Sequence, residues 1–283
     1  MVRPDTLDTL ITLALEEDVG PGDVTTLWTV AENAVGHAVV VAKEPVVVAG
    51  MDAALAVFRR VDPTLDLRVQ LENGARAAPE EILLRIRGSL RSILTAERVA
   101  LNFLGRLSGI ATTTRRFATE VSGTSATVLD TRKTTPGWRI LEKEAVRAGE
   151  GGNHRMGLHD MVLVKDNHIQ AAGGITAAVE GVRRENRDGL PVEVEVGTLA
   201  ELDEALKLGV DRILLDNMGL DEMTAAVART RAWGDRRPEL EASGNMTLDR
   251  VRAVAETGVD FISVGALTHS APGADLSLRV LED

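Results

Sequence analysis

Residues 192–217 read VEVEVGTLAELDEALKLGVDRILLDN and contain the repeating unit that decides the fold. An apolar run at 192–196 is followed by a glycine, a helical stretch and a second apolar run at 212–216. A strand, a helix and another strand in this order are typical of the βα units of a parallel sheet. The stretch therefore predicts an α/β fold.

Similar apolar runs recur along the chain about 20 to 35 residues apart, which suits crossover connections between parallel strands. They occupy residues 126–130, 161–164, 192–196, 212–216, 240–242 and 261–265. Their regular recurrence predicts a closed or nearly closed α/β barrel for residues 107–270.

The first hundred residues have a different pattern. Apolar residues three and four apart predict a helix over 5–15, and alternating apolar residues predict strands at 65–71 and 82–86. A long helical stretch follows these strands. We therefore expect an N-terminal helix-and-sheet domain at 1–106, with the C-terminal tail 271–283 packed against it.

The composition limits the possible partners. The formal net charge is −11, from 32 Lys and Arg against 43 Asp and Glu, which argues against nucleic acid or an anionic membrane as the main partner. The chain has no cysteine, which excludes disulfides and thiolate nucleophiles and fits a cytoplasmic protein. The segment Met1–Leu10 lacks the apolar core of an export signal, and we expect no membrane span.

Polar residues follow the apolar runs at the points where the predicted strands end. In an α/β barrel these strand ends and the following loops form the active face. The residues are Asp130-Thr131-Arg132-Lys133, Lys165-Asp166-Asn167-His168, Glu195, Asp216-Asn217, Ser243-Gly244-Asn245, and Gly265 with His269. We expect them to share one cavity mouth.

Positive charges gather at this mouth in an otherwise acidic protein. They are Arg132, Lys133, Arg155 and Lys165, with His154 beside them. Arginine binds carboxylate or phosphate with two parallel hydrogen bonds and lysine acts as a compact charge, so the group predicts a small ligand with several negative charges.

Three other cations are interpreted as structural, since they lie on a helical stretch that also carries acids. The cations are Arg139, Lys143 and Arg147, and the acids are Glu142, Glu144 and Glu150.

The alternation in Val192-Glu193-Val194-Glu195-Val196 places the two glutamates on one face and the valines on the other. Valines belong against the helix layer, so both glutamates are expected to face the barrel interior. Glu193 would pair with a buried cation. Glu195 and Asp216, which ends the next run in the same way, form a candidate Mg²⁺ site.

Two glycine-containing segments follow the last two predicted strands. Ser243-Gly244-Asn245 and Gly265-Ala266 lie where barrels often bind phosphate through backbone N–H groups, so they are candidates for a phosphate site. A transition-metal site is not expected, because His154 and His159 do not have the i, i+4 spacing of a helical zinc pair.

Longer motifs run in order through nearly the whole chain. They are EEDVGPGDVTT (16–26), AERVALN (96–102), DTRKTTPG (130–137), NHR (153–155), VKDNH (164–168), EVEV (193–196), LLDN (214–217) and VGALTHS (264–270). Together they resemble the quinolinate phosphoribosyltransferase family. A paralogous group associated with molybdenum transport keeps DTRK but lacks KDNH and NHR, so the resemblance is to the biosynthetic enzyme.

The resemblance implies an enzyme of de novo NAD biosynthesis that converts quinolinate and phosphoribosyl pyrophosphate to nicotinate mononucleotide, pyrophosphate and CO2, with Mg²⁺. It implies an N-terminal open-faced α/β sandwich and an incomplete (β/α) barrel of fewer than eight strands. It also implies a homodimer in which Arg98 reaches the active site of the other subunit.

The resemblance also assigns roles by position. The two quinolinate carboxylates would meet Arg98, Arg132, His154, Arg155 and Lys165. Phosphoribosyl pyrophosphate and its Mg²⁺ would meet Lys133, Glu195 and Asp216, and the 5-phosphate would meet Ser243, Gly244 and Gly265. Thr131, Asn245, Ala266 and His269 complete the expected substrate-binding set, and the expected catalytic residues are Lys133, Lys165, Glu195 and Asp216. The segment Glu241–Asn245 departs from many relatives, which have a second serine or glycine there.

Three other functions remain open. Lys165 could form a Schiff base as in a class I aldolase, but this leaves Glu195 and Asp216 without a role. A non-catalytic phosphate-binding regulator would bind ligand without releasing pyrophosphate. Nicotinate in place of quinolinate would leave part of the cation group without a partner.

Overall fold

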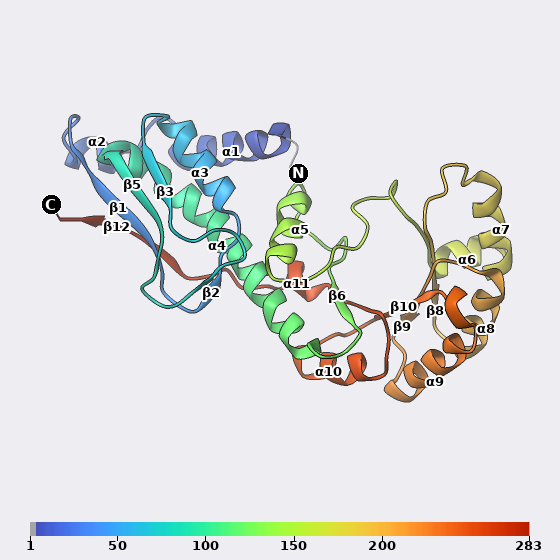
Figure 1. Cartoon of the computed structure of the whole chain (residues 1–283). Coiled ribbons are helices and arrows are strands. Elements are labelled where there is room, and N and C mark those ends of the chain that lie inside the picture. The colour runs from blue at the N-terminus through green and yellow to red at the C-terminus, as the bar shows by residue number, and fades with distance from the viewer. Residues whose placement is uncertain (1–3, 283) are drawn as a thin grey trace. The chain divides into compact units, whose positions relative to one another are not determined.

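The computed structural model describes residues 4–282, and these residues form two compact units. The first unit contains the chain up to Arg115, the segment Thr135–Glu150 and the segment that begins at Ala271. The second unit contains the residues between these segments. Figure 1 shows the elements of each unit.

Helix α4 (Leu90–Val121) runs through the expected domain boundary after residue 106. The first unit extends along this helix to Arg115 and also takes in α5 (Arg139–Ala148). The expected domain limits of 1–106 and 107–270 stay a prediction.

An antiparallel sheet with the strand order β12-β1-β5-β3 forms the centre of the first unit. Its strands are β1 (Val35–Ala42), β3 (Asp66–Val69), β5 (Ile82–Ser89) and β12 (Leu276–Leu281). Along β5, Leu84 and Ile86 are buried, whereas Arg85 and Arg87 are exposed. The sheet therefore buries one face and exposes the other, as the expected open-faced sandwich does.

The C-terminal tail is part of this sheet, because β12 pairs with β1 from Ala42↔Leu276 to His37↔Leu281. A second, two-stranded sheet joins β2 (Val46–Val47) and β4 (Arg76–Ala77). The remaining helices of this unit are α1 (Pro4–Val19), α2 (Val24–Thr29) and α3 (Met51–Val61). The helix expected over 5–15 lies within α1.

Six parallel strands form the sheet of the second unit, in the order β6-β11-β10-β9-β8-β7. They are β6 (Thr127–Leu129), β7 (Val162–Val164), β8 (Val192–Val196), β9 (Arg212–Asp216), β10 (Glu239–Ser243) and β11 (Phe261–Ser263). Each of the six apolar runs forms one of these strands. The predicted (β/α) architecture is confirmed.

Helices connect consecutive strands and cover the outer face of the sheet (Figure 1). They are α6 (Asp166–Ala172), α7 (Ile175–Glu185), α8 (Leu199–Leu208), α9 (Leu220–Arg231) with a 3-10 turn after it (Gly234–Arg236), and α10 (Leu248–Glu256). A short helix, α11 (Ala266–His269), follows the last strand. Among residues 4–282, no helix has both the length and the apolar character needed to span a membrane.

The barrel is incomplete, because β6 and β7 are edge strands that do not pair with each other in the described part of the chain. The segment that leads into β7 makes one parallel bridge to β6, between Leu129 and Gly152. This segment, residues 152–161, is called the seam segment below.

Local sequence sets the end of β8, where a candidate site residue lies. Val192, Val194 and Val196 are buried, and the two glutamates between them point to the opposite face. Immediately after the strand, the Thr198 hydroxyl caps α8 by accepting a hydrogen bond from the Glu201 N–H. The Glu201 carboxylate accepts from the Thr198 N–H in return. This capping box ends the strand just beyond Glu195.

Candidate active site

A cavity of about 270 Å³ opens at the carboxyl ends of the parallel strands. It is lined by Thr131, Arg132, Lys133, His154, Arg155, Leu163, Lys165, Glu195, Leu214, Asp216, Glu241, Ser243 and Ser263. All of these residues belong to the second unit. The structure thus brings the expected cations and acids into one space.

A second cavity of about 590 Å³ adjoins the first. Five residues line both cavities: Thr131, Lys133, Asp216, Ser243 and Ser263. The second cavity is otherwise lined by Asn217, Gly244, Asn245, Met246, Thr247, Gly265, Ala266 and His269. The predicted cation group and the predicted phosphate segments therefore lie in adjoining halves of one site.

Arg98 is the one residue with an expected substrate-binding role that does not line either cavity. It lies on α4 in the first unit, its side chain is 61% exposed, and its guanidinium lies 3.9 Å from Glu97. Four residues expected at the cavity mouth also line neither: Asp130, Asp166, Asn167 and His168.

Lys165 follows β7 and places its ammonium group in the cavity. Its Nζ lies 2.6 Å from Glu195 Oε2, and its backbone N–H donates to the His168 ring. A Schiff-base lysine must present its nitrogen to a carbonyl substrate, whereas this nitrogen is held in an ion pair with Glu195, so the geometry does not favour the aldolase alternative.

Arg132 and Arg155 bring two guanidinium groups to the same cavity. Burial, and then the nearby Arg132 charge, lowers the pKa of Arg155. Arg155 Nη1 also donates to the Met161 carbonyl, which fixes its orientation. Two like charges near each other attract an anion that binds between them.

Glu195 and Asp216 lie on the neighbouring strands β8 and β9. Glu195 pairs in register with Leu214, and Asp216 lies two residues further along β9 on the same face. Both line the first cavity. Carboxylate oxygens are the ligands Mg²⁺ prefers, so this donor set fits that ion.

The loop after β10 requires glycine. Gly244 has a φ of +102°, and a Cβ there would collide with the Asn217 side chain. Asn245 also has a positive φ, of +44°. The tight loop brings backbone groups to the wall of the second cavity.

Lys133 is held by contacts on both sides of it. The Thr131 hydroxyl accepts a hydrogen bond from the Lys133 N–H, and the Thr268 hydroxyl donates to the Lys133 carbonyl. A Cβ added to Gly265 would lie 3.1 Å from the Lys133 side chain and 3.1 Å from His269. Gly265 therefore allows Lys133 and His269 to share the cavity wall.

Asp130 is buried and has a structural contact that the sequence did not reveal. Its carboxylate accepts from the His154 N–H at 2.9 Å and from the Asn153 side chain at 2.6 Å. Asp130 therefore joins the end of β6 to the seam segment.

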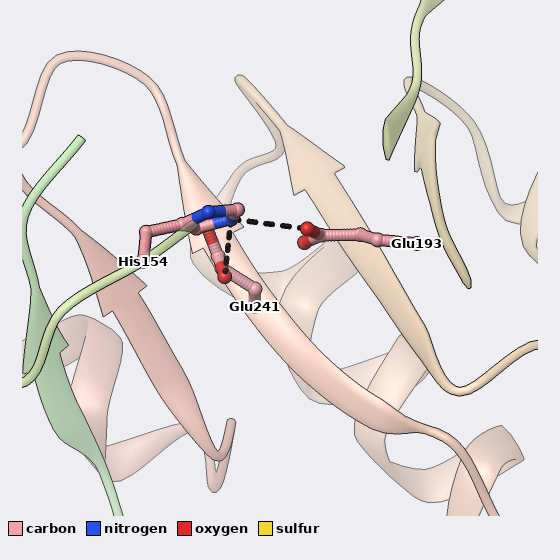
Figure 2. A group of neighbouring side chains, drawn as sticks. All are labelled: His154, Glu193 and Glu241. Carbon is pink, nitrogen blue, oxygen red and sulfur yellow. Dashed lines mark hydrogen bonds and ion pairs between the residues drawn. The ribbon is translucent and has the colours of Figure 1, made fainter. Parts of the chain in front are cut away.

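His154 is almost fully buried between Glu193 and Glu241, as Figure 2 shows. Its Nε2 lies 3.0 Å from Glu193 Oε2 and 3.5 Å from Glu241 Oε2. Its Nδ1 accepts the Arg155 backbone N–H at 2.7 Å. Because a backbone amide can only donate, Nδ1 is the acceptor in this contact, and Nε2 is the ring nitrogen that faces the two carboxylates.

Glu193 was expected to pair with a buried cation. Its hydrogen-bond partner is the buried His154 ring, and its Oε1 has no partner. The Arg212 charge acts on Glu193 as well, but its guanidinium donates to Glu241, at 3.1 Å. Burial raises the pKa of both Glu193 and Glu241 to about 7.

Glu241 is a cavity-lining residue that the sequence analysis did not select. A signal was present, since Glu239-Leu240-Glu241-Ala242-Ser243 alternates in the same way as the β8 motif. Its carboxylate also accepts from the Ser263 hydroxyl on β11.

His154, Glu193 and Glu241 could together offer three ligand atoms to a metal ion, all within 4.8 Å of one another. Arg212 already brings a positive charge to Glu241, and a metal cation beside it would be repelled. We therefore interpret the group as a hydrogen-bonded network.

One of the three cations interpreted as structural pairs with an acid of the same helix, as expected, since Arg147 lies 3.8 Å from Glu144 on α5. The other two acids bind arginines of α4, because Arg106 contacts Glu142 at 2.9 Å and Arg115 contacts Glu150 at 2.8 Å. Spacing within one helix could not reveal these partners.

Two family models match the chain. The model described as the N-terminal domain of quinolinate phosphoribosyl transferase matches residues 23–108, and the model of the C-terminal domain matches residues 110–279. Together they cover most of the sequence.

Individual relatives agree with the family models. A Synechocystis protein named probable nicotinate-nucleotide pyrophosphorylase (carboxylating) is 44% identical, over 95% of this chain and 90% of its own. A Nicotiana tabacum protein named quinolinate phosphoribosyltransferase (decarboxylating) 1b is 42% identical, over 96% and 81%. The solved structure of the nicotinate-nucleotide pyrophosphorylase from Francisella tularensis has a TM-score of 0.95 and 38% identity, covering 99% of this chain and 98% of that one.

Proposed function

Because the chain belongs to the quinolinate phosphoribosyl transferase family, we propose that its two adjoining cavities are the site where quinolinate and phosphoribosyl pyrophosphate react. The chain is a phosphoribosyltransferase of de novo NAD biosynthesis. Its products are nicotinate mononucleotide, pyrophosphate and CO2. The observation that supports the site is that Arg132, Lys165, Glu195 and Asp216 line one cavity.

The first cavity suits quinolinate, which carries two carboxylates. Arg132, Arg155 and Lys165 line it and can neutralise both charges. Nicotinate has one carboxylate and would leave a cation without a partner, so the dianion is the better match. His154 acts here through its contacts with Glu193 and Arg155, since both of its ring nitrogens are engaged.

The residues between the two cavities suit the pyrophosphate group. Lys133 supplies a positive charge, and Glu195 and Asp216 would hold Mg²⁺. The ion, when bound, neutralises the charge of the departing pyrophosphate. Lys165 would then exchange its contact with Glu195 for one with substrate.

The second cavity suits the sugar 5-phosphate. Ser243, Gly244, Asn245, Gly265 and Ala266 would surround this phosphate, with Thr131 and His269 near the pyrophosphate. Backbone N–H groups in tight glycine loops bind phosphate without a bulky side chain in the way.

The reaction follows from this placement. The quinolinate nitrogen bonds to the anomeric carbon of ribose as the bond from that carbon to pyrophosphate breaks. The ring nitrogen is then positive, so the adjacent carboxylate leaves as CO2 and its electron pair stays on the ring carbon. A proton then takes that position. Orientation of the two substrates and stabilisation of positive charge by the carboxylates supply the catalysis.

A homodimer with a shared active site is part of the proposal. Arg98 is exposed in a unit that contributes no residue to the cavities, so a second subunit can receive it. Exposed apolar side chains on α2 offer an interface, above all Trp28, which is 81% exposed. The absence of cysteine supports a cytoplasmic location.

The direct test uses purified protein with quinolinate, phosphoribosyl pyrophosphate and Mg²⁺. We expect nicotinate mononucleotide and CO2 in equal amounts, no turnover after chelation of Mg²⁺, and little product with nicotinate. Ligand binding without pyrophosphate release would favour the regulator. An adduct trapped on Lys165 by borohydride with a carbonyl substrate would favour the aldolase.

A further inference from the structure

The open side of the barrel leaves the seam segment without a strand ladder. Residues 152–161 make one backbone bridge to β6, between Gly152 and Leu129. Arg155, whose guanidinium lines the cavity, lies in this segment. Side-chain contacts must therefore hold the segment in place.

Two sets of side-chain contacts join the segment to the strands, and others close turns within it. At the start of the segment, buried Asp130 accepts from Asn153 and from the His154 N–H. Within the segment, Asp160 accepts from the Met156 and Gly157 N–H groups. The second set is made by the His154 ring, which reaches into the barrel and meets Glu193 and Glu241 (Figure 2).

The His154 contact differs from the Asp130 contact because it reaches across the sheet. Glu193 comes from β8, which pairs with β7. Glu241 comes from β10, which is next to neither β6 nor β7. On β9 between them, Arg212 donates to Glu241 and lies 4.0 Å over the Phe261 ring. Three neighbouring strands thus join in one buried group beneath the cavity.

The contact also links directly to Arg155. When Nε2–H donates to Glu193, Nδ1 is left as an acceptor, and it takes the Arg155 backbone N–H. A ring that lost Glu193 could turn or change tautomer, and the Arg155 N–H would then lose its acceptor. The position of the Arg155 backbone therefore depends on a carboxylate on another strand.

We infer that Glu193 and Glu241 are positioning residues that act through His154 to hold the seam segment closed and to place Arg155 against the diacid substrate. This inference rests on the proposed function for the identity of the substrate. The part of the inference that concerns the closed seam segment does not depend on the proposed function, because this closure is a property of the unliganded protein.

The test compares Glu193→Leu with Glu193→Gln, which keeps an acceptor oxygen. In Glu193→Leu we expect amide exchange across 152–161 to rise about tenfold or more, and the KM for quinolinate to rise about tenfold. The KM for phosphoribosyl pyrophosphate should stay within about twofold, because the other cavity half is untouched. In Glu193→Gln, both the amide exchange of 152–161 and the KM for quinolinate should stay close to the wild-type values.

Glu239→Gln is the matched control. Glu239 is on the same strand as Glu241 and also contacts Arg212, at 2.9 Å, but it is exposed and does not line the cavity. Its substitution should leave both KM values and the exchange of 152–161 near those of the wild type.

A double substitution separates action through His154 from independent action. If Glu193 acts through the ring, Glu193→Leu added to His154→Ala should raise the quinolinate KM no further than His154→Ala alone. Additive effects, equal rises in both KM values, or wild-type exchange in Glu193→Leu would each overturn the inference. If the wild type made no nicotinate mononucleotide, the proposed function would fail. The exchange measurement would still show whether Glu193 holds the seam segment closed.

Discussion

Lys165 and Glu195 lie 2.6 Å apart at the cavity wall and neutralise each other in the unliganded protein. The anionic substrate and Mg²⁺ would each bring the opposite charge to one member of this pair, so binding would replace the Lys165–Glu195 contact with two new ones. The site therefore holds its charges in place before binding, which reduces the reorganisation needed during the reaction.

Substitutions that remove single cations from the cavity test whether these placed charges support the reaction. For Lys165→Ala and Arg132→Ala we expect kcat/KM to fall by about 10²- to 10³-fold, since each removes a charge placed for an anion. The thermal midpoint should change little for Lys165→Ala, because the Lys165 side chain is 44% exposed. Steady-state kinetics and calorimetry measure the two effects.

Lys207→Ala, at an exposed position on α8, serves as a control and should keep wild-type turnover. Wild-type turnover in Lys165→Ala or Arg132→Ala would contradict their roles.

The raised pKa of Glu241 predicts that the stability of the protein depends on pH. Burial, and then the nearby Glu193 charge, raises this pKa from the usual 4.5 to about 7. Between these two values the folded protein keeps a proton that the unfolded chain releases, so the contribution of this group to stability falls as pH rises. The contribution is fully present below pH 4.5 and is lost by about pH 7.

Glu241→Gln removes this titration. Urea unfolding from pH 4.5 to 7.5 should show the wild type losing up to about 3 kcal/mol relative to the variant across the window. The exposed Glu239→Gln variant should keep the wild-type slope. A wild type that gained stability relative to Glu241→Gln as pH rose would contradict the assignment.

At the level of elements, α4 accepts the C-terminal chain directly on its surface. The Ala274 N–H donates to the Gly105 carbonyl at 2.9 Å, and a Cβ added to Gly109 would collide with the Pro272 carbonyl. Glycine in the middle of a helix is unfavourable by itself. Its presence here is explained by the close approach of the segment that leads into β12.

Gly109→Ala should therefore lower the free energy of unfolding by about 1–3 kcal/mol, because the tail must move away from the helix. Gly181→Ala is a matched control on α7, where an added Cβ has only ordinary contact with Arg184. That substitution should raise stability by about 0.5–1 kcal/mol through its better helix propensity. Denaturant titration measures both, and a stabilised Gly109→Ala would show that the tail does not need the glycine.

At the level of the whole molecule, the proposed shared site predicts complementation between inactive subunits. Arg98→Ala and Lys165→Ala homodimers should each be nearly inactive. In mixed dimers, the site that keeps Lys165 receives an intact Arg98 from the other subunit. After refolding an equal mixture, we expect about a quarter of wild-type activity, since half the dimers are mixed and each has one intact site. A mixture that stays inactive would argue against sharing.

Much of the architecture could be predicted from local sequence. The six apolar runs became the six strands, and the period of two placed Glu193 and Glu195 on the inner face of β8. These patterns depend on neighbours a few residues away, so they can be read without knowing the fold. The motifs also identified the family.

Only the tertiary structure decided which side chains meet. The partner of Glu193 is His154, 39 residues away, and the acceptor role of Asp130 was not visible in any motif. The alternation of residues 239–243 could place Glu241 on the inner face of its strand, but not its contacts with His154, Arg212 and Ser263. The helix α5 likewise joins the first unit although it lies between two segments of the second. Periodicity tells which face a residue occupies, but the identity of its partner depends on which distant segments the barrel brings together.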